Sequence, residues 1–342
     1  MKSQILQNIS LKPYNTFGID CTAKSFVEVK TVEQLLNILE MVKAEQPKFP
    51  SIFILGGGSN VLFLKDFDGL IIKNSITGIE KVKENEKDIT LYVSAGENWH
   101  NFVLFCLENN YGGVENLSLI PGTVGAAPMQ NIGAYGVEIR NVVERVKVID
   151  RKTNKQFWIS NKQCQFGYRS SIFKHEAKDK YIIIGVEFRL TKENHVLNTS
   201  YGAIKDALEN DTPTIQEISK AIISIRESKL PNPKEIGNGG SFFKNPEILS
   251  NQFEKLKEEF PAIVGYPISD EITKVPAGWL IEKCGWKGKV VGNTGAHKNQ
   301  ALVLVNYGNA KGEEVWNLAK EIQQSVFNKF GIEIEPEINI VG

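Results

Sequence analysis

Ser241 is the first residue whose surroundings suggest chemistry. It lies among Gly237, Gly239 and Gly240, and two phenylalanines follow it. So many glycines exceed what a helix start needs and are typical of a place where another group approaches the backbone closely. A serine hydroxyl has a pKa too high for ordinary acid catalysis, so it can donate a proton only to a strongly basic acceptor such as a carbanion or enolate. The alternative is an ordinary helix-capping serine, which the nearby Pro246 favours.

Arg169 and Glu337 could bind or stabilise an anion. Arg169 follows Tyr168 in a polar loop between predicted strands, and a guanidinium suits a two-point grip on a carboxylate or phosphate. Glu337 is the last of three alternating glutamates near the C-terminus. Alternation of this kind normally marks the solvent-facing side of a strand, and most arginines are solvated. From the residue types alone, both interpretations stay open.

Two glycine-rich segments could approach a large ligand through their backbones. One is Gly56–Asn60, between two predicted strands. The other is Gly112–Gly136, which holds six glycines, two prolines and three alanines. Strand, glycine turn, strand differs from a Rossmann or P-loop arrangement, and neither fingerprint is present. The longer segment is either a cradle for the diphosphate of a dinucleotide cofactor or a buried connection at a tight packing point.

The composition and charge of the chain limit the classes of partner that we expect. The 342 residues include 40 Lys and Arg against 40 Asp and Glu, which gives no reason to expect a nucleic acid or an acidic membrane surface as a partner. We find no apolar run of bilayer length and no signal-peptide core, so we expect a cytoplasmic protein. The four cysteines and four histidines are dispersed without metal-ligand spacing, so no metal site is expected. Without a heptad seam, a monomer is the expectation.

The pattern of elements predicts an α+β fold. Helices are expected over residues 31–46, 98–109, 214–229, 246–260, 277–284 and 312–330. Strands are expected over 51–55, 61–64, 69–76, 89–95, 141–149, 155–159, 181–190, 300–306 and 331–341. Residues 1–25 read as irregular, and the charged stretch 80–88 reads as a hairpin loop. The two prolines after residue 229 favour a domain boundary there.

Several motifs now combine. In chain order they are GGGSN at 56–60, IPGTVGAAP at 120–128, NIGAYG at 131–136, GYRSSIFK at 167–174, GGSFFKNP at 239–246, AGWLIE at 277–282, GAH at 295–297, QALVLVN at 300–306 and EPE at 335–337. Together they resemble the UDP-N-acetylenolpyruvoylglucosamine reductase family, FAD enzymes that make UDP-N-acetylmuramate for bacterial peptidoglycan. The resemblance runs from about Asn15 to Glu337 and matches the longer family type.

The resemblance implies a fold and a cofactor site. It implies a two-lobed FAD-binding domain of the vanillyl-alcohol-oxidase type, with lobes at 1–67 and 68–230 and a C-terminal strand near 334–342 joining the first lobe. An α+β substrate-binding domain would occupy 231–333. The residues implied to hold non-covalent FAD are Gly56, Gly57, Gly58, Ser59, Asn60, Gly122, Thr123, Gly125, Ala126, Asn131 and Gly133.

The resemblance also implies roles for the reacting residues. Arg169 would bind and polarise the substrate carboxylate, Ser241 would donate the proton, and Glu337 would help stabilise the enolate-like intermediate. The implied substrate contacts are Tyr168, Tyr201, Lys229, Asn245 and Gln300. The threonine usual before the loop tyrosine is Ser200 here, a mild departure.

The implied reaction is NADPH-dependent reduction of UDP-N-acetylglucosamine enolpyruvate. NADPH would reduce FAD, flavin N5 would pass hydride to the terminal carbon of the enol ether, and Ser241 would protonate the carbon beside the carboxylate. Two alternatives remain from the sequence: an FAD oxidase of the same fold, and a nucleotide-binding protein without catalysis. No histidine lies in an obvious flavin-attachment context, and an oxidase would leave the motifs around Ser241 and Glu337 unexplained.

Overall fold

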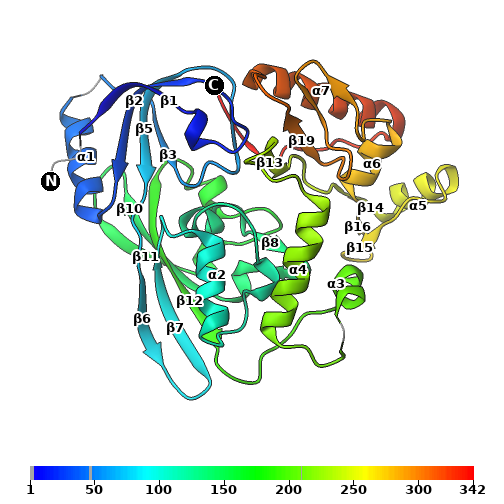
Figure 1. The fold of residues 1–342 in the computed structure, drawn as a ribbon, viewed down its shortest axis with the longest axis horizontal. Helices are drawn as coiled ribbons and strands as arrows, with labels where there is room; N and C mark the ends of the chain where they lie inside the picture. Colours follow the sequence, from blue (N-terminus) through cyan, green and yellow to red (C-terminus); the bar gives the residue numbers. More distant parts are fainter. Residues whose placement is uncertain (1–3, 46–47, 209) are drawn as a thin grey trace. The chain divides into compact units, whose positions relative to one another are not determined.

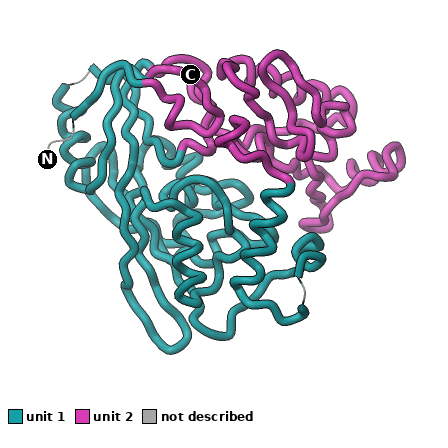
Figure 2. Tube along the Cα trace, viewed as in Figure 1, with its two compact units in different colours: residues 1–9, 23–57, 68–228 teal, residues 10–22, 58–67, 229–342 magenta. Residues whose placement is uncertain are grey.

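The chain folds into two compact units. A computed structural model describes residues 4–45, 48–208 and 210–342 (Figure 1). Unit 1 comprises Met1–Ile9, Ala23–Gly57 and Asp68–Ser228, and unit 2 comprises Ser10–Thr22, Gly58–Phe67 and Lys229–Gly342 (Figure 2). Each unit contains helices and strands, so the predicted α+β class is confirmed. The last change of unit along the chain falls between Ser228 and Lys229.

The first sheet of unit 1 has the strand order β1-β2-β5-β3, and β3 and β5 are parallel. Its strands are β1 (Leu6–Ser10), β2 (Thr22–Val29), β5 (Phe67–Asn74) and β3 (Ile52–Leu55). Helix α1 (Val32–Ala44) begins at Thr31, whose Oγ1 accepts a hydrogen bond from the Gln34 N–H as predicted. Its side chains at i, i+3, i+4 and i+7 join the core of this sheet: Leu35, Ile38, Leu39 and Val42.

The second sheet of unit 1 is antiparallel, in the order β11-β10-β12-β7-β6. Its strands are β11 (Gln156–Ser160), β10 (Val143–Asp150), β12 (Tyr181–Thr191), β7 (Asp88–Ser94) and β6 (Ile79–Glu84). Helix α2 (Trp99–Glu108) buries Trp99, Phe102 and Cys106 against it, as expected. This sheet carries an extensive apolar core.

The remaining elements of unit 1 surround the glycine-rich segment. Two helices, α3 (Gly202–Ala207) and α4 (Ile215–Lys229), share a small isoleucine-rich core. The segment contains the 3-10 turns η2 (Glu115–Leu117) and η3 (Val124–Gln130) and the short pair β8 (Gly133–Ala134) and β9 (Val137–Glu138). Further 3-10 turns are η4 (Ile139–Asn141), η5 (Lys162–Cys164) and η6 (Ile172–Lys174).

Unit 2 is built on a sheet in the order β13-β19-β18-β17, covered by α7. These elements are β13 (Gly237–Ser241), β19 (Val303–Asn306), β18 (Thr294–Ala296), β17 (Val290–Val291), α6 (Ala277–Lys283) and α7 (Gly312–Phe330). A second sheet, β14-β16-β15, consists of β14 (Glu247–Leu249), β16 (Ile272–Lys274) and β15 (Tyr266–Pro267), beside α5 (Ser250–Glu259). Strand β4 (Val61–Phe63) pairs in parallel with β20 (Asn339–Val341), and η1 (Lys12–Tyr14) is a 3-10 turn.

Helix α7 shows why the predicted amphipathic pattern folds as it does. Its buried residues recur at helical spacing from Val315 to Val326, and it has the predicted bounds. Gly331 ends it with a left-handed φ of 62°, and its N–H donates to the Phe327 carbonyl oxygen. At the other end, a Cβ on Gly312 would collide with the Phe63 carbonyl oxygen, so glycine is required where the helix meets β4.

Four local predictions were wrong. Residues 1–25 were expected to be irregular, but they include β1 and the start of β2. The charged stretch 80–88 is largely β6, an edge strand whose charged side chains are exposed. Residues 247–249 pair with β16, so the helix expected from 246 begins only at Ser250. The C-terminal strand expected over 331–341 is reduced to β20 and a bridge between Phe243 and Pro336. The expected end of α1 at Gln46 lies outside the described residues.

Candidate active site

In unit 1 the two glycine-rich segments touch. A Cβ on Gly57 would lie 2.7 Å from the Gly122 Cα, and one on Gly56 would lie 2.7 Å from Thr123 Oγ1. Any side chain at these positions would push the segments apart, so the glycines permit close backbone approach. The Lys73 ammonium donates to the Gly56 carbonyl oxygen at 2.7 Å, and burial lowers its pKa. The result is a close contact between the two segments with a cation beside it.

The glycine-rich segment is anchored at the end of β7. The Gly125 N–H donates to the Ala95 carbonyl oxygen, and a Cβ on Gly125 would lie 2.5 Å from the Ala95 Cβ. The Trp99 N–H at the start of α2 donates to the Gly122 carbonyl oxygen. The segment is therefore tightly packed at this point. Gly122, Thr123, Gly125 and Ala126 all lie in this anchored stretch.

Arg169 lies at the tip of a tight turn. Gly167 and Ser170 exchange backbone hydrogen bonds of 3.0 and 3.2 Å, which leaves Tyr168 and Arg169 between them. Arg169 has a φ of 50°, an uncommon left-handed conformation for a residue with a side chain. A Cβ on Gly133 would lie 3.4 Å from Arg169 Nη1, so the guanidinium lies over the glycine-rich segment. The guanidinium carbon is 5.7 Å from the centre of the Tyr168 ring.

Asn131 connects this turn to the glycine-rich segment. It is fully buried, with a left-handed φ of 47°. Its Nδ2 donates to Glu138 Oε2 at 2.8 Å and to the Gly167 carbonyl oxygen at 3.0 Å, while its Oδ1 accepts from the Arg140 N–H. All of these partners are protein groups, so the side chain holds the arginine turn in place.

Tyr135 and Tyr201 meet in unit 1. Their rings pack edge to face, with centroids 5.3 Å apart. Tyr201 is 48% exposed, and it lies just before α3. Asn116 ties the two chain segments together, because its Nδ2 donates to the Tyr135 carbonyl oxygen at 3.1 Å and to the Asn198 carbonyl oxygen at 2.9 Å. The predicted substrate residue Tyr201 is thus positioned by Tyr135, a partner that sequence reasoning missed.

In unit 2 the segments that carry Ser241 and Glu337 lie side by side. The Glu337 N–H donates to the Phe242 carbonyl oxygen at 2.7 Å, and the Lys244 N–H donates to the Glu335 carbonyl oxygen at 2.9 Å. Ser241 is exposed at the end of β13 and is not a helix cap. Glu337 is half-buried, unlike Glu335. An accessible hydroxyl and a sheltered carboxyl group therefore lie on adjacent segments.

The turn predicted to hold a cofactor contacts the same segments. Asn60 Nδ2 donates to the Glu337 carbonyl oxygen at 3.3 Å, and the Asn339 N–H donates to the Asn60 carbonyl oxygen at 3.1 Å. Gly58 has a left-handed φ of 66°, and a Cβ there would collide with the Tyr14 carbonyl oxygen. Asn60 therefore lies beside Glu337 in unit 2, and Gly58 and Ser59 precede it in the same unit.

Thr16 holds these segments together, and sequence reasoning missed it. Its N–H donates to the Gly58 carbonyl oxygen at 3.0 Å, and its Oγ1 donates to the Asn238 carbonyl oxygen at 2.6 Å. The Asn238 N–H donates back to the Thr16 carbonyl oxygen. Asn306 Nδ2 adds a bond to the Phe17 carbonyl oxygen at 2.9 Å. Only the position of Thr16 within the motif region could have marked it.

Asn245 and Gln300 come together at the start of α6. Asn245 Oδ1 accepts from the Ala277 N–H at 3.0 Å, and a Cβ on Gly278 would lie 3.1 Å from Gln300 Oε1. Lys229, the last residue of α4, is exposed. Two of the predicted substrate residues therefore share one location in unit 2, while Tyr168 and Tyr201 lie in unit 1.

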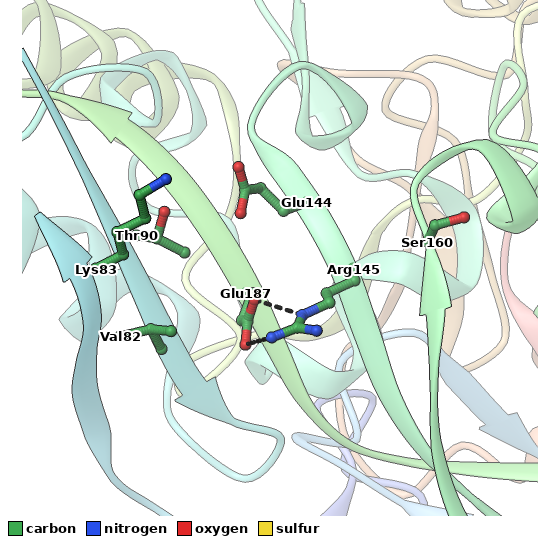
Figure 3. A pocket seen from close by; sticks show the side chains of 7 residues that line it. All are labelled: Val82, Lys83, Thr90, Glu144, Arg145, Ser160 and Glu187. Atoms are coloured by element: carbon green, nitrogen blue, oxygen red, sulfur yellow. Dashed lines mark hydrogen bonds and ion pairs between the residues drawn. The ribbon is translucent and has the colours of Figure 1, made fainter.

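A separate hollow of about 530 Å³ lies on the five-stranded sheet of unit 1 (Figure 3). Its lining residues come from all five strands: Val82, Lys83, Thr90, Glu144, Arg145, Ser160 and Glu187. Arg145 Nε and Nη2 donate to the two Glu187 carboxylate oxygens at 2.6 and 2.8 Å, and Arg145 stacks over Trp158. None of the predicted site residues lines this hollow. We interpret the ion pair of Arg145 and Glu187 in it as part of the packing between neighbouring strands.

The described residues contain neither a membrane-spanning helix nor a cluster of metal-ligating side chains. In residues 4–45, 48–208 and 210–342 there is no helix with the length and apolar character to cross a membrane. Over the same ranges, histidine, cysteine, aspartate and glutamate side chains form no group of three or more that could hold a metal ion.

Comparison with family models defines the class first. Residues 23–159 match the model described as an FAD binding domain, and residues 232–341 match the model described as the UDP-N-acetylenolpyruvoylglucosamine reductase C-terminal domain. The chain is therefore an FAD-binding oxidoreductase with a second domain specific to one family. The predicted combination of an FAD-binding domain and a C-terminal domain is confirmed.

Full-length relatives then identify the family. A UDP-N-acetylenolpyruvoylglucosamine reductase from Flavobacterium johnsoniae is 51% identical over 341 residues, covering 99% of this chain and 100% of the relative. One from Amoebophilus asiaticus is 47% identical and covers 98% of each chain. The crystal structure of the Thermus caldophilus reductase shares the fold, with a TM-score of 0.66 at 21% identity over both full chains. The chain belongs to the UDP-N-acetylenolpyruvoylglucosamine reductase family, which confirms the resemblance.

The ion pair in the hollow supports a stability prediction. Arg145→Met leaves the Glu187 carboxylate, whose side chain is 4% exposed, without its guanidinium. We expect the free energy of unfolding, measured in urea, to fall by about 2 kcal/mol. This loss is smaller than for a fully buried ion pair because the Arg145 side chain is 43% exposed. The double variant Arg145→Met/Glu187→Leu should regain most of that loss.

Activity is the second readout for these variants. Because the hollow holds none of the predicted site residues, the folded double variant should turn over at the wild-type rate. A large fall in turnover with unchanged stability would place chemistry in the hollow and contradict this assignment.

Proposed function

We propose that this protein reduces UDP-N-acetylglucosamine enolpyruvate to UDP-N-acetylmuramate, with NADPH as the reductant and FAD as the bound cofactor. This reaction is a step of peptidoglycan synthesis. The observation that carries the proposal is the hydrogen bond from the Glu337 N–H to the Phe242 carbonyl oxygen, which fixes Glu337 beside the segment of Ser241. The 51% identity with a full-length reductase supports the same activity.

The residues present fit FAD. The two glycine-rich segments suit a diphosphate, because Gly56 and Gly57 allow their backbones to meet and the Lys73 ammonium lies beside them. We assign the remaining cofactor contacts to Gly58, Ser59, Asn60, Thr123, Gly125, Ala126 and Gly133, and a positioning role to Asn131. When bound, FAD supplies the hydride that originates in NADPH.

The protein residues control the negative charge that hydride addition creates. Hydride addition to the terminal carbon of the enol ether leaves charge on the carbon beside the carboxylate. Arg169 binds that carboxylate, and Glu337 helps to stabilise the charge. The exposed Ser241 hydroxyl then protonates the carbon, which is basic enough to take a serine proton. We assign Tyr168, Tyr201, Lys229, Asn245 and Gln300 to the rest of the sugar nucleotide.

Several points stay predictions. The division into lobes at 1–67 and 68–230 with a substrate domain at 231–333 is one of them. A monomeric state and a cytoplasmic location are others. The location is supported by the free thiols of Cys21, Cys106, Cys164 and Cys284, which suit a reducing compartment.

One experiment separates this function from its alternatives. The purified protein should be yellow with bound, non-covalent FAD, should bleach on anaerobic addition of NADPH, and should regain its colour when the enolpyruvyl sugar nucleotide is added. Return of colour only on admitting air would indicate an oxidase. A colourless protein that takes up no FAD would contradict both flavin functions and leave nucleotide binding.

Ser241→Ala tests the proton donor. The variant should bleach with NADPH at the wild-type rate, because flavin reduction does not need this hydroxyl. Reoxidation by the sugar nucleotide should slow by about 10²-fold or more, the usual contribution of a positioned proton donor. Stopped-flow absorbance measures both half-reactions, and equal losses in the two would rule out the assigned role.

Gly57→Ala tests the glycine cradle. The added Cβ would meet Gly122 at 2.7 Å, and relieving that overlap should weaken FAD binding about tenfold or more. Gly202→Ala is the matched control, because a Cβ there meets no atom within 4 Å. Flavin content and FAD titration of the apoprotein are the measurements. Wild-type affinity in Gly57→Ala would show that the cofactor is held elsewhere.

A further inference from the structure

Asn116 joins the segment that carries Tyr201 to the glycine-rich segment, and the reaction proposed above gives it no role. It lies in η2 and is 1% exposed. Its Nδ2 donates to the Tyr135 carbonyl oxygen at 3.1 Å and to the Asn198 carbonyl oxygen at 2.9 Å. One amide group therefore holds two carbonyl oxygens from segments that are far apart in the sequence.

The orientation of this amide group follows from its two acceptors. Carbonyl oxygens only accept hydrogen bonds, so an amide oxygen facing them would be repelled by both. The Asn116 Oδ1 is left buried, with no hydrogen-bond partner among the residues that the structure describes. An unpaired buried acceptor costs free energy, and an apolar side chain would avoid that cost. The bridge between the two segments is therefore what the asparagine contributes at this position.

Asn198 extends the connection to the residue before Tyr201. Its Nδ2 donates to the Gly136 carbonyl oxygen at 3.1 Å. Its Oδ1 accepts hydrogen bonds from the Ser200 Oγ at 2.8 Å and from the Ser200 N–H at 3.3 Å. Gly136 has a φ of 80°, and a Cβ there would lie 2.9 Å from the Asn198 Nδ2, so a glycine allows this approach. Hydrogen bonds thus connect Asn116 through Asn198 to Ser200.

A ring contact and a backbone pair complete the connection. The rings of Tyr135 and Tyr201 pack edge to face, with centroids 5.3 Å apart. Earlier in the chain, Gly112 and Thr191 exchange backbone hydrogen bonds of 2.8 and 3.1 Å. Tyr201 is 48% exposed, so its ring is fixed by its neighbours and still accessible to a ligand.

We propose that Asn116 is a positioning residue for the sugar nucleotide, acting through Asn198 and Tyr135 to fix the place from which Tyr201 meets this ligand. The proposal rests on the proposed function, which assigns Tyr201 to the sugar nucleotide. A tyrosine that is held in place before the ligand arrives loses less entropy on binding. Removal of the bridge should therefore weaken binding of the sugar nucleotide and leave the reduction of FAD by NADPH unchanged.

The variant Asn116→Ala, studied in the FAD-loaded enzyme, removes both donors. The Kd of the sugar nucleotide, measured from the change in flavin absorbance, should rise about tenfold because two buried carbonyl oxygens lose their partner. The maximum rate of bleaching by NADPH should stay at the wild-type value. Asn116→Asp keeps the shape but places an oxygen opposite the two carbonyl oxygens, so it should weaken binding at least as much.

A double-mutant cycle with Tyr201→Ala separates positioning from a general loss of stability. If Asn116 acts through Tyr201, then Asn116→Ala should change the Kd by less than about twofold when residue 201 is already alanine. Asn74→Ala is the matched control. Asn74 is 5% exposed, and its Nδ2 donates to the Ile183 carbonyl oxygen at 3.2 Å, so this variant also loses a buried bridge. It should lower the free energy of unfolding in urea and leave the Kd unchanged.

The proposal is overturned if a folded Asn116→Ala that retains its flavin binds the sugar nucleotide within about twofold of wild type, a change too small for two lost hydrogen bonds. It is also overturned if the effects of Asn116→Ala and Tyr201→Ala are additive, if Tyr201→Ala has no effect, or if Asn74→Ala weakens binding as much. If Asn116→Ala does not fold, the same cycle with Asn198→Ala decides by the same criteria. Failure of the proposed function itself is distinguishable, because the wild-type enzyme would then not be reoxidised by the sugar nucleotide.

Discussion

The hydrogen bond between the Glu337 N–H and the Phe242 carbonyl oxygen is the contact on which the proposed chemistry depends. It holds the segment of Glu337 beside the segment that carries Ser241. The Glu337 nitrogen lies 2.7 Å from the Phe242 carbonyl oxygen. Thr16 stabilises the arrangement by bonding both Gly58 and Asn238. Segments far apart in the chain are thereby fixed largely through backbone groups.

Unit 1 places positive charge beside the two glycine-rich segments. Glycines allow two segments to approach within a distance that no side chain permits, and Asn131 holds the turn that carries Arg169. The left-handed conformation of Arg169 is uncommon, and the surrounding hydrogen bonds enforce it. The guanidinium of Arg169 is thus positioned before any ligand arrives, which reduces the entropy lost on binding.

Local sequence patterns predicted helices α1, α2, α4 and α7 because each has a long apolar stripe. They failed for β6, whose charged residues form an edge strand that only its neighbour β7 reveals. The motifs around Arg169, Ser241 and Glu337 were visible in the sequence, but their roles came from family resemblance. Tyr135 escaped notice because its ring contact with Tyr201 joins two segments that no periodicity connects.

The central claim is that Ser241 and Glu337 act together on one carbanionic carbon. The most direct measurement is a double-mutant cycle on flavin reoxidation by the enolpyruvyl sugar nucleotide, using Ser241→Ala, Glu337→Gln and the double variant. Because groups that act as a unit are non-additive, the double variant should be little slower than the slower single variant, with bleaching by NADPH unchanged in all three. Fully additive losses, or slower bleaching in the same proportion, would contradict the account.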